Sequence, residues 1–275
     1  MTKLGIIAGG GALPRTLAEH ARATSRPVYI LGLRGFADPA LWSEFGGAEA
    51  AMGEIGKGIR LLRDAGCKDV VFAGTIKRPE LSDLKFDFHG ATLLPELAVA
   101  AGKGDDALLR VVLGAFEKAG FRIIGADDVL GNLLAPTGPL GSLGPSQQDW
   151  VDIRKAAEAA AAIGAKDVGQ GAVSRNGAIL ATETQDGTDA MLRRVAEASA
   201  GAKGGVLVKR PKPQQERRID LPTIGVQTLR GAHAAGLSGI VVEAGGALVM
   251  NRAELQTEAD RLGLFVYGAS PGELA

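Results

Sequence analysis

The first half of the chain alternates short apolar runs with longer amphipathic stretches, and this alternation restricts the possible folds more than any other feature. Four apolar runs are each followed directly by a glycine: Leu4–Ala8, Val28–Leu31, Val70–Ala73 and Phe121–Ile124. Between them, residues 12–23, 55–65 and 105–119 carry apolar side chains at helical spacing. Short buried strands that alternate with helices are typical of a parallel sheet covered by helices. We therefore expect residues 1–133 to form an α/β domain with a parallel sheet.

A different pattern follows a segment rich in proline and glycine. Residues 134–146 contain three prolines and three glycines, which neither a helix interior nor a central strand tolerates, so we interpret them as a linker. Beyond it, Asn176-Gly177 separates two alternating arms and predicts a β-hairpin. We expect residues 147–275 to form a second α/β or α+β domain of unusual topology.

The second half also contains regular helix and strand patterns. The expected helices cover residues 148–163, 190–200, 224–235 and 253–262. The expected strands, besides the hairpin arms 168–174 and 178–184, cover residues 206–209, 240–243 and 264–267. Asn251 followed by Glu254 predicts a capping box at the start of the last helix.

The composition excludes several classes of protein. With 31 basic and 31 acidic residues, the chain lacks the basic excess of a protein that coats nucleic acid, so we expect no nucleic-acid partner. A single cysteine, Cys67, excludes a disulfide framework and a cysteine zinc site. No apolar stretch approaches the roughly 20 residues that a membrane span needs. We therefore expect a cytoplasmic protein.

The first apolar run leads into Gly9-Gly10-Gly11, a glycine turn that opens a helix. Backbone N–H groups at such a turn favour a bound phosphate. The turn is similar to that of a dinucleotide-binding fold, so we describe the first domain as Rossmann-like. However, Pro14 replaces the third glycine of that fingerprint and the second strand ends without an acidic residue, which disfavours NAD. A phosphate contact and a plain tight turn both stay open.

The densest polar chemistry lies in residues 209–225. This segment carries five cations: Lys209, Arg210, Lys212, Arg217 and Arg218. Asp220 lies between the arginines and a turn that begins a helix, where its carboxylate could bind a metal or activate water while the cations bind phosphates. A solvated loop is the alternative interpretation.

A second acidic set closes the expected hairpin and opens a helix. Its carboxylates, Glu183, Asp186 and Asp189, are oxygen ligands of the kind that Mg²⁺ prefers. The alternative is that Asp186 or Thr188 caps the helix and Asp189 favours its dipole. Residues 103–106 begin another helix and allow the same two interpretations.

Six motifs in a fixed order make the chain resemble a known family. They are Ile7-Ala-Gly-Gly-Gly-Ala-Leu-Pro14, Ala73-Gly-Thr-Ile-Lys-Arg-Pro79, Lys103-Gly-Asp-Asp106, Asp167-Val-Gly-Gln170, Asp186-Gly-Thr-Asp189 and Arg218-Ile-Asp-Leu-Pro-Thr-Ile-Gly225. Together they are similar to UDP-2,3-diacylglucosamine pyrophosphatases of the LpxI type. The resemblance covers nearly the whole chain.

The resemblance implies a hydrolase of lipid A biosynthesis in a Gram-negative bacterium, which converts UDP-2,3-diacylglucosamine and water into 2,3-diacylglucosamine 1-phosphate (lipid X) and UMP. It implies Mg²⁺ or another divalent cation, a catalytic C-terminal domain and a substrate held between the two domains. It also implies that catalysis needs the carboxylate of Asp220. Because the substrate is lipid-linked, we expect transient peripheral contact with the cytoplasmic face of the inner membrane. A homodimer stays open.

The predicted site combines these motifs. The metal ligands are expected to be Asp220, Asp186 and Asp189. The residues expected to bind substrate are Gly10, Gly11, Thr75, Lys77, Asp105, Gln170, Thr188, Lys209 and Lys212. Two other classes of function stay open: another nucleotide-sugar enzyme, such as a transferase that would release UDP, and a non-catalytic nucleotide or lipid-binding protein.

Overall fold

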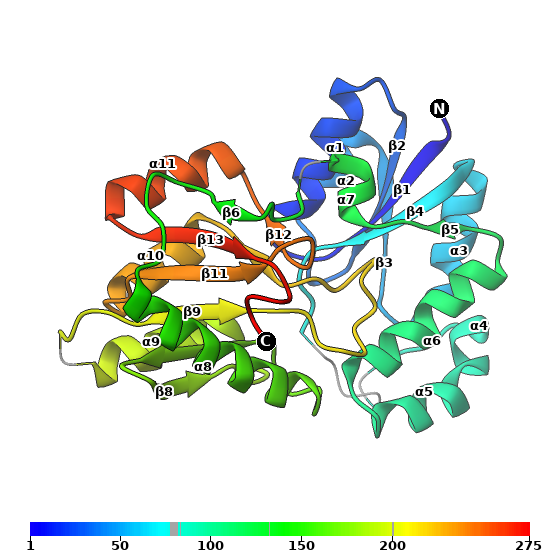
Figure 1. Cartoon of the computed structure of the whole chain (residues 1–275). Coiled ribbons are helices and arrows are strands. Elements are labelled where there is room, and N and C mark those ends of the chain that lie inside the picture. Colours follow the sequence, from blue (N-terminus) through cyan, green and yellow to red (C-terminus); the bar gives the residue numbers. More distant parts are fainter. Residues whose placement is uncertain (78–81, 83, 132, 200) are drawn as a thin grey trace. The chain divides into compact units, whose positions relative to one another are not determined.

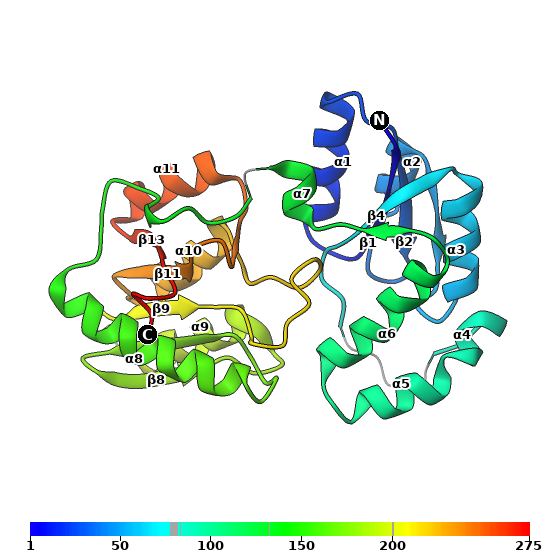
Figure 2. The ribbon, with the colours of Figure 1, turned by 45° about the vertical axis from the view of Figure 1, so that its right-hand side comes forward.

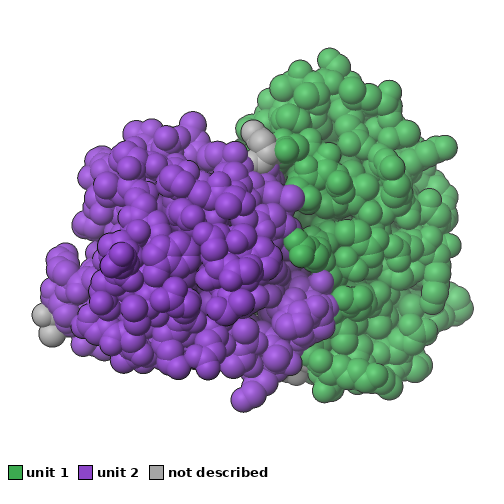
Figure 3. Space-filling model, viewed as in Figure 1, with its two compact units in different colours: residues 1–131, 216–219 green, residues 132–215, 220–275 purple. Residues whose placement is uncertain are grey.

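The computed structural model describes the whole chain except residues 78–81, 83, 132 and 200, and it divides into two compact units. Unit 1 comprises Met1–Gly131 and Glu216–Ile219, and unit 2 comprises Asn132–Gln215 and Asp220–Ala275 (Figure 3). The chain therefore passes between the units three times along its sequence. Residues 134–146, which we expected to be a linker, belong to unit 2.

Unit 1 is built on a five-stranded parallel sheet (Figure 1). The strand order is β3-β2-β1-β4-β5, with β1 Lys3–Ala8, β2 Val28–Leu33, β3 Gly47–Ala50, β4 Cys67–Ala73 and β5 Arg122–Ile123. The helices are α1 Leu13–Ala23, α2 Ala40–Phe45, α3 Ile55–Asp64, α4 Phe88–Thr92, α5 Leu94–Ala101, α6 Asp105–Lys118 and α7 Ala126–Leu130. The expected α/β domain with a parallel sheet is confirmed.

Helices cover both faces of this sheet, which explains its continuous apolar strands. Five of the six residues of β1 are buried, as in strands that are covered on both sides. Figure 2 shows α1 and α7 on one side of the sheet and α3 on the other. Leu62 of α3 and Phe116 of α6 share one apolar cluster with Val70 of β4.

Unit 2 contains a six-stranded mixed sheet and a small two-stranded sheet. The large sheet has the order β6-β13-β11-β9-β7-β8, with β6 Gly138–Pro139, β7 Gly171–Arg175, β8 Ala178–Thr182, β9 Val206–Lys209, β11 Gly239–Glu243 and β13 Phe265–Ala269. The small sheet pairs β10 Thr223–Ile224 with β12 Leu248–Val249. The helices are α8 Gln147–Gly164, α9 Gly187–Ala198, α10 Val226–Ala234 and α11 Arg252–Leu262.

Alternate residues of β9 face different helices across the large sheet. Val206 and Val208 belong to an apolar cluster with Ile153 of α8. Leu207 belongs to a second cluster with Met191 of α9. Because side chains two positions apart in a strand share a face, Lys209 extends from the face that Leu207 shares with α9.

The hairpin predicted at Asn176-Gly177 is present. Arg175 pairs with Ala178 across the turn, and Asn176 and Gly177 have φ values of 53° and 75°, as a two-residue hairpin turn requires. The capping box predicted at Asn251 is absent: this residue precedes α11 with φ 46° and no capping hydrogen bond. Its side-chain amide donates instead to the Glu254 carboxylate, at 3.3 Å.

The segment expected to be a linker is tied to the large sheet of unit 2. Its strand β6 pairs antiparallel with β13, with Gly138 opposite Gly268, and Leu140 is buried. Proline is tolerated there because β6 is an edge strand. None of the helices formed by the described residues is long and apolar enough to cross a membrane.

Candidate functional site

In unit 1 the strand order reverses between β1 and β4. From β1 the chain continues to β2 on one side, and β4 lies on the other side. Loops that follow two such strands leave a crevice at the carboxyl edge of a parallel sheet, where α/β proteins bind their ligands. Here the two loops are Gly9–Gly11 and Gly74–Thr75.

Backbone hydrogen bonds join these two loops. The Gly10 amide donates to the Thr75 carbonyl at 2.8 Å, and the Thr75 amide donates to the Gly10 carbonyl at 2.9 Å. Gly74 has φ 96°, and a Cβ atom there would lie 2.5 Å from the Gly10 carbonyl oxygen, so only glycine fits this approach. The structure therefore brings Gly10, Gly11 and Thr75 together at the start of α1.

The other predicted residues of unit 1 lie on the same loop or at a helix start. Lys77 is exposed two residues beyond Thr75, and Asp105 is the first residue of α6. Arg78 and Pro79, which complete the motif around Thr75, lie outside the described residues.

Asp106, which the sequence indicated only as part of the motif at residues 103–106, has a clear structural role in unit 1. Its buried carboxylate accepts hydrogen bonds from the Glu216 amide and from Arg110 Nε, both at 2.6 Å. Asp106 therefore fixes the returning segment Glu216–Ile219 to the start of α6.

In unit 2 the predicted residues Lys209 and Thr188 form one hydrogen-bonded chain. Lys209, at the end of β9, is only 4% exposed. Its Nζ donates to Thr188 Oγ1 at 2.7 Å and to the Thr223 carbonyl at 3.3 Å. Thr188 Oγ1 in turn donates to the Glu183 carboxylate at 2.8 Å. A buried ammonium is thus held by two oxygens and linked through a hydroxyl to a buried carboxylate.

The charges around Lys209 show which carboxylates lie near it. Burial lowers the pKa of the Lys209 ammonium, while the negative charges of Glu183, Asp189 and Asp220 act to raise this pKa. The charges of two predicted metal ligands, Asp189 and Asp220, thus act on the buried ammonium.

Glu183 also positions the backbone around Gln170. Its carboxylate accepts from the Gln170 amide at 3.2 Å. A Cβ atom on Gly171 would lie 2.9 Å from Glu183 Oε2, and one on Gly169 would lie 2.5 Å from the Glu183 carbonyl oxygen. The glycines that flank Gln170 are thus needed for this close packing. The sequence indicated Glu183 only as one of three acidic residues and did not predict its contact with Gln170.

Hydrogen bonds extend this network from Gln170 to Lys212. The Gln170 side-chain oxygen accepts from Gln215 Nε2 at 3.1 Å. Gln215 Oε1 accepts from the Lys212 amide at 2.9 Å. The predicted residues Gln170, Lys212, Lys209 and Thr188 therefore belong to one part of unit 2.

The Lys212 side chain forms a buried ion pair. Its Nζ lies 2.7 Å from Asp167 Oδ1, and the two side chains are 11% and 9% exposed. Asp167 has φ 56°, and its Oδ2 atom is buried without a hydrogen-bond partner in the structure. The ammonium that we expected to bind phosphate faces a carboxylate, an arrangement that spacing in the sequence did not indicate.

The three predicted metal ligands differ in their surroundings. Among the described residues, no group of three or more His, Cys, Asp or Glu side chains is placed to hold a metal ion. Asp186 is exposed before α9, and its carboxylate accepts a hydrogen bond from the Thr184 hydroxyl at 3.4 Å. Mg²⁺ is usually held by one or two carboxylates together with substrate phosphates and water. The described residues thus show no preformed site of three carboxylates, and a site of fewer carboxylates that is completed by the substrate stays a prediction for Asp220, Asp186 and Asp189.

Comparisons with known proteins cover both halves of the chain. Residues 3–133 match the model of the LpxI N-terminal domain, and residues 136–267 match that of the LpxI C-terminal domain. A protein named UDP-2,3-diacylglucosamine pyrophosphatase LpxI, from Caulobacter vibrioides, is 52% identical over an alignment 279 positions long that covers 99% of each chain.

Solved structures give weaker matches. A short-chain dehydrogenase/reductase superfamily protein from Agrobacterium tumefaciens is 19% identical over 49% of this chain and 37% of its own, with a TM-score of 0.25. An isoflavone reductase is 14% identical over 99% of this chain and 80% of its own, with a TM-score of 0.30. These scores are too low to support an argument about fold or function.

Proposed function

This chain belongs to the LpxI family, and we propose that it hydrolyses the diphosphate of UDP-2,3-diacylglucosamine to 2,3-diacylglucosamine 1-phosphate and UMP. The observation that carries the proposal is the 52% identity to the Caulobacter vibrioides protein over 99% of both chains. The similarity thus extends over the whole length of both chains rather than over one motif.

The chemistry of unit 2 supports this reaction. A diphosphate repels an attacking water until its negative charge is neutralised. The Lys209 ammonium is held rigidly by Thr188 and Thr223, so it can stabilise a phosphate without first being reoriented. We propose that Asp220, whose charge acts on Lys209, orients the attacking water and accepts its proton.

A divalent cation would complete the charge balance. We propose that Mg²⁺ binds to Asp220 and Asp189 together with the substrate phosphates, and Asp186 is retained as a third candidate ligand. When bound, Mg²⁺ would neutralise phosphate charge as a Lewis acid. The chain's own contribution would be carboxylates whose charges act on the buried lysine.

Unit 1 offers a second set of groups for the same substrate. The Gly10 amide donates to the Thr75 carbonyl, but the turn continues through Gly11 into the first turn of α1, where backbone amides suit a phosphate. We propose that these amides, with Thr75, Lys77 and Asp105, bind the substrate together with the residues of unit 2. We also propose that Gln170 and Lys212 of unit 2 bind the substrate. The Lys212 ammonium would first separate from the Asp167 carboxylate.

The test is to identify the products by mass spectrometry after incubating UDP-2,3-diacylglucosamine and Mg²⁺ with the protein in heavy-oxygen water. We expect lipid X and UMP, with the label in the product whose phosphorus is attacked. Asp220→Ala should lose turnover. Asp64→Ala, which removes an exposed carboxylate at the end of α3, should retain it. Release of UDP would identify a transferase, and no turnover under any condition would favour a binding protein.

A further inference from the structure

The helices α4 and α5 of unit 1 expose an unusual amount of apolar surface. The side chain of Phe88 is 90% exposed, that of Val99 63% and that of Leu94 38%. Figures 1 and 2 both show these two short helices beside α6 at one end of unit 1. Isolated exposed apolar residues are common, but several on one pair of adjacent helices indicate an interaction site.

The core of unit 1 does not account for this exposed surface. Leu93 and Leu97 supply the buried side of the pair and join the cluster that contains Phe116. The opposite side of α5 is also apolar and exposed, at positions that are helical neighbours: Leu94, Pro95, Ala98 and Val99. A helix that is apolar on both sides normally has a second apolar partner.

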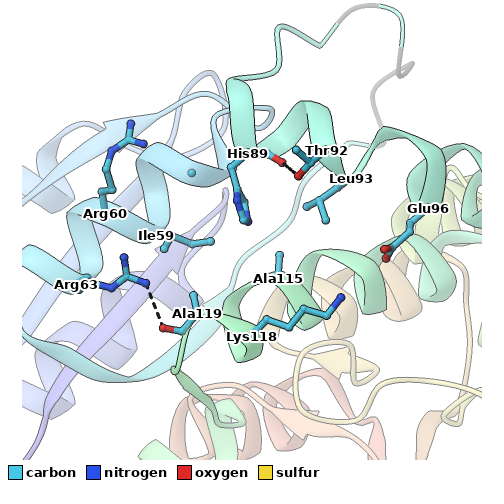
Figure 4. Close-up of a pocket in the computed structure, with 11 residues that line it drawn as sticks. Ile59, Arg60, Arg63, His89, Thr92, Leu93, Glu96, Ala115, Lys118 and Ala119 are labelled. Atoms are coloured by element: carbon cyan, nitrogen blue, oxygen red, sulfur yellow. Dashed lines mark hydrogen bonds between the residues drawn. The ribbon is translucent and has the colours of Figure 1, made fainter.

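A cationic cavity is lined in part by residues of the same two helices. Its volume is about 510 Å³, and it lies among α3, α4, α5 and α6. Figure 4 shows Arg60, Arg63 and Lys118 around it, with the apolar side chains of Ile59 and Leu93 in its lining. The acidic residue among the lining side chains is Glu96. The cavity therefore offers apolar walls and an excess of positive charge, which suits an anion attached to an apolar body.

None of these three cations takes part in an ion pair among the described residues. In the part of the chain that the structure describes, most arginines near a carboxylate form ion pairs, but Arg60, Arg63 and Lys118 form none. Arg63 donates to the Ala119 carbonyl at 3.2 Å. Burial acts to raise the pKa of Asp87, but backbone hydrogen bonds, with a smaller contribution from the charge of Arg60, lower it. The cations thus stay available to an external anion.

We propose that α4 and α5 form the surface by which this protein docks on an anionic lipid bilayer, with a lipid phosphate at Arg60, Arg63 and Lys118. Phe88, Leu94 and Val99 then enter the headgroup region, where exposed aromatic and aliphatic side chains flanked by cations bind. The inference rests on the proposed function in one respect: a lipid-linked substrate must be collected from a membrane.

A second copy of the chain is a poorer occupant of this surface. In a two-fold dimer the same patch would face itself. Arg60, Arg63 and Lys118 of one copy would then approach those of the other, and the single Glu96 carboxylate in each cavity lining would not balance three cations. An anionic bilayer complements both the charge and the apolar side chains.

The test is flotation of the purified full-length protein with vesicles. Phosphatidylcholine vesicles are compared with vesicles in which about one quarter of the lipid is phosphatidylglycerol. The apolar variant is Phe88→Ser with Val99→Ser, and its control is Leu143→Ser with Val151→Ser, which are exposed apolar residues of unit 2. The charge variant is Arg60→Ala, Arg63→Ala and Lys118→Ala, and its control removes the exposed cations Lys68, Arg154 and Lys203.

We expect the wild type to float with the anionic vesicles and to bind neutral ones weakly. Each cation near the surface contributes about fivefold to binding, so the charge variant should lose about 100-fold in affinity. The apolar variant should also lose binding, while both controls retain it. Equal flotation of wild type and variants, or equal binding to both vesicle types, overturns the proposal.

A parallel assay separates this proposal from the proposed function. Hydrolysis is measured on substrate dispersed in detergent micelles, where no bilayer is needed. Variants that lose vesicle binding but keep micellar turnover support a docking surface. Variants that lose micellar turnover but float normally overturn the docking proposal and indicate a site for the substrate's acyl chains. Variants whose oligomeric mass changes while they float normally overturn it and indicate self-association. Flotation without hydrolysis by the wild type supports docking and refutes the proposed function instead.

Discussion

The ion pair between Asp167 and Lys212 allows a quantitative prediction about unit 2. We consider Asp167→Asn, Lys212→Met and the double variant. Asparagine tolerates the left-handed backbone of residue 167, where φ is 56°, and methionine keeps much of the length of the lysine side chain without its charge. Each single variant removes one charge and leaves the other buried, whereas the double variant removes both.

The burial of the pair sets the expected magnitudes. Two opposite charges about 4 Å apart attract by about 4 kcal/mol at an effective dielectric constant near 20. The side chains are 11% and 9% exposed, so water screens them little, but part of this attraction offsets their desolvation. We expect Lys212→Met to cost about 3–5 kcal/mol, because it leaves Asp167 buried with one oxygen that already has no partner. Asp167→Asn should cost about 2–3 kcal/mol, and the coupling energy should be about 2–3 kcal/mol.

The assay is urea unfolding followed by the fluorescence of Trp150. This residue lies in α8 of unit 2, where its ring contacts that of Tyr267 at 5.6 Å between centroids. The chain has two tryptophans, so all variants are made in a Trp42→Phe background to remove the signal of unit 1. Circular dichroism of the same samples checks that the helices remain folded before urea is added.

The double-mutant cycle gives a direct refutation. If the free-energy losses of the single variants add up to that of the double variant within about 0.5 kcal/mol, the two side chains do not interact as a buried pair. Our account of the Asp167–Lys212 pair would then be wrong, and binding of a phosphate by the Lys212 ammonium would not require its separation from Asp167.

Three further predictions concern other parts of the chain. Burial raises the pKa of the Cys67 thiol to about 11. We therefore expect this thiol to react slowly with Ellman's reagent at about pH 8 until the protein unfolds. Reaction of the folded protein at the rate of a small-molecule thiol would contradict this prediction. Hydrogen bonds from Arg261 and Arg230 lower the pKa of Glu258 to about 2. The wild type should therefore have a higher thermal midpoint than Glu258→Gln above about pH 4.5, and this difference should be lost as the pH falls toward 2. A difference that does not depend on pH would refute the prediction. Gly74→Ala should destabilise unit 1 by about 1–3 kcal/mol, because the new Cβ would lie 2.5 Å from the Gly10 carbonyl oxygen; unfolding is monitored by the fluorescence of Trp42. The control is Gly114→Ala, at a position with open space within α6. It should leave the stability unchanged or raise it by up to about 1 kcal/mol.

The sequence predicted the elements whose pattern is strong and local. The apolar run at Val206–Lys209 matches β9 residue for residue, and the hairpin at Asn176-Gly177 follows from turn chemistry alone. The strand β3, Gly47–Ala50, was missed because Gly-Ala-Glu-Ala has a low strand propensity and is a strand only through its pairing with β2. Helix α5 was missed because apolar residues on both of its sides hide the helical period.

The candidate site was predictable as a set of motifs but not as a geometry. Gly10 and Thr75 are joined because β1 and β4 are neighbours, and strand order is not visible in a single sequence. Asp167 and Lys212 lie 45 residues apart, and only the folded backbone brings them into contact. The environment of Lys209 likewise depends on the pairing of β9 with β7 and on the start of α9.

The return of the chain to unit 1 at Glu216–Ile219 has a consequence for how the protein is made. Asp106 binds the Glu216 amide, Glu117 pairs with Arg218 at 2.7 Å, and Ile219 packs against the core of unit 1. During synthesis, unit 1 therefore leaves the ribosome without four residues that complete its packing, and it must wait until most of unit 2 has been translated. A gene truncated after Gly131 would encode unit 1 without Glu216–Ile219, and only the second half of the gene encodes that segment.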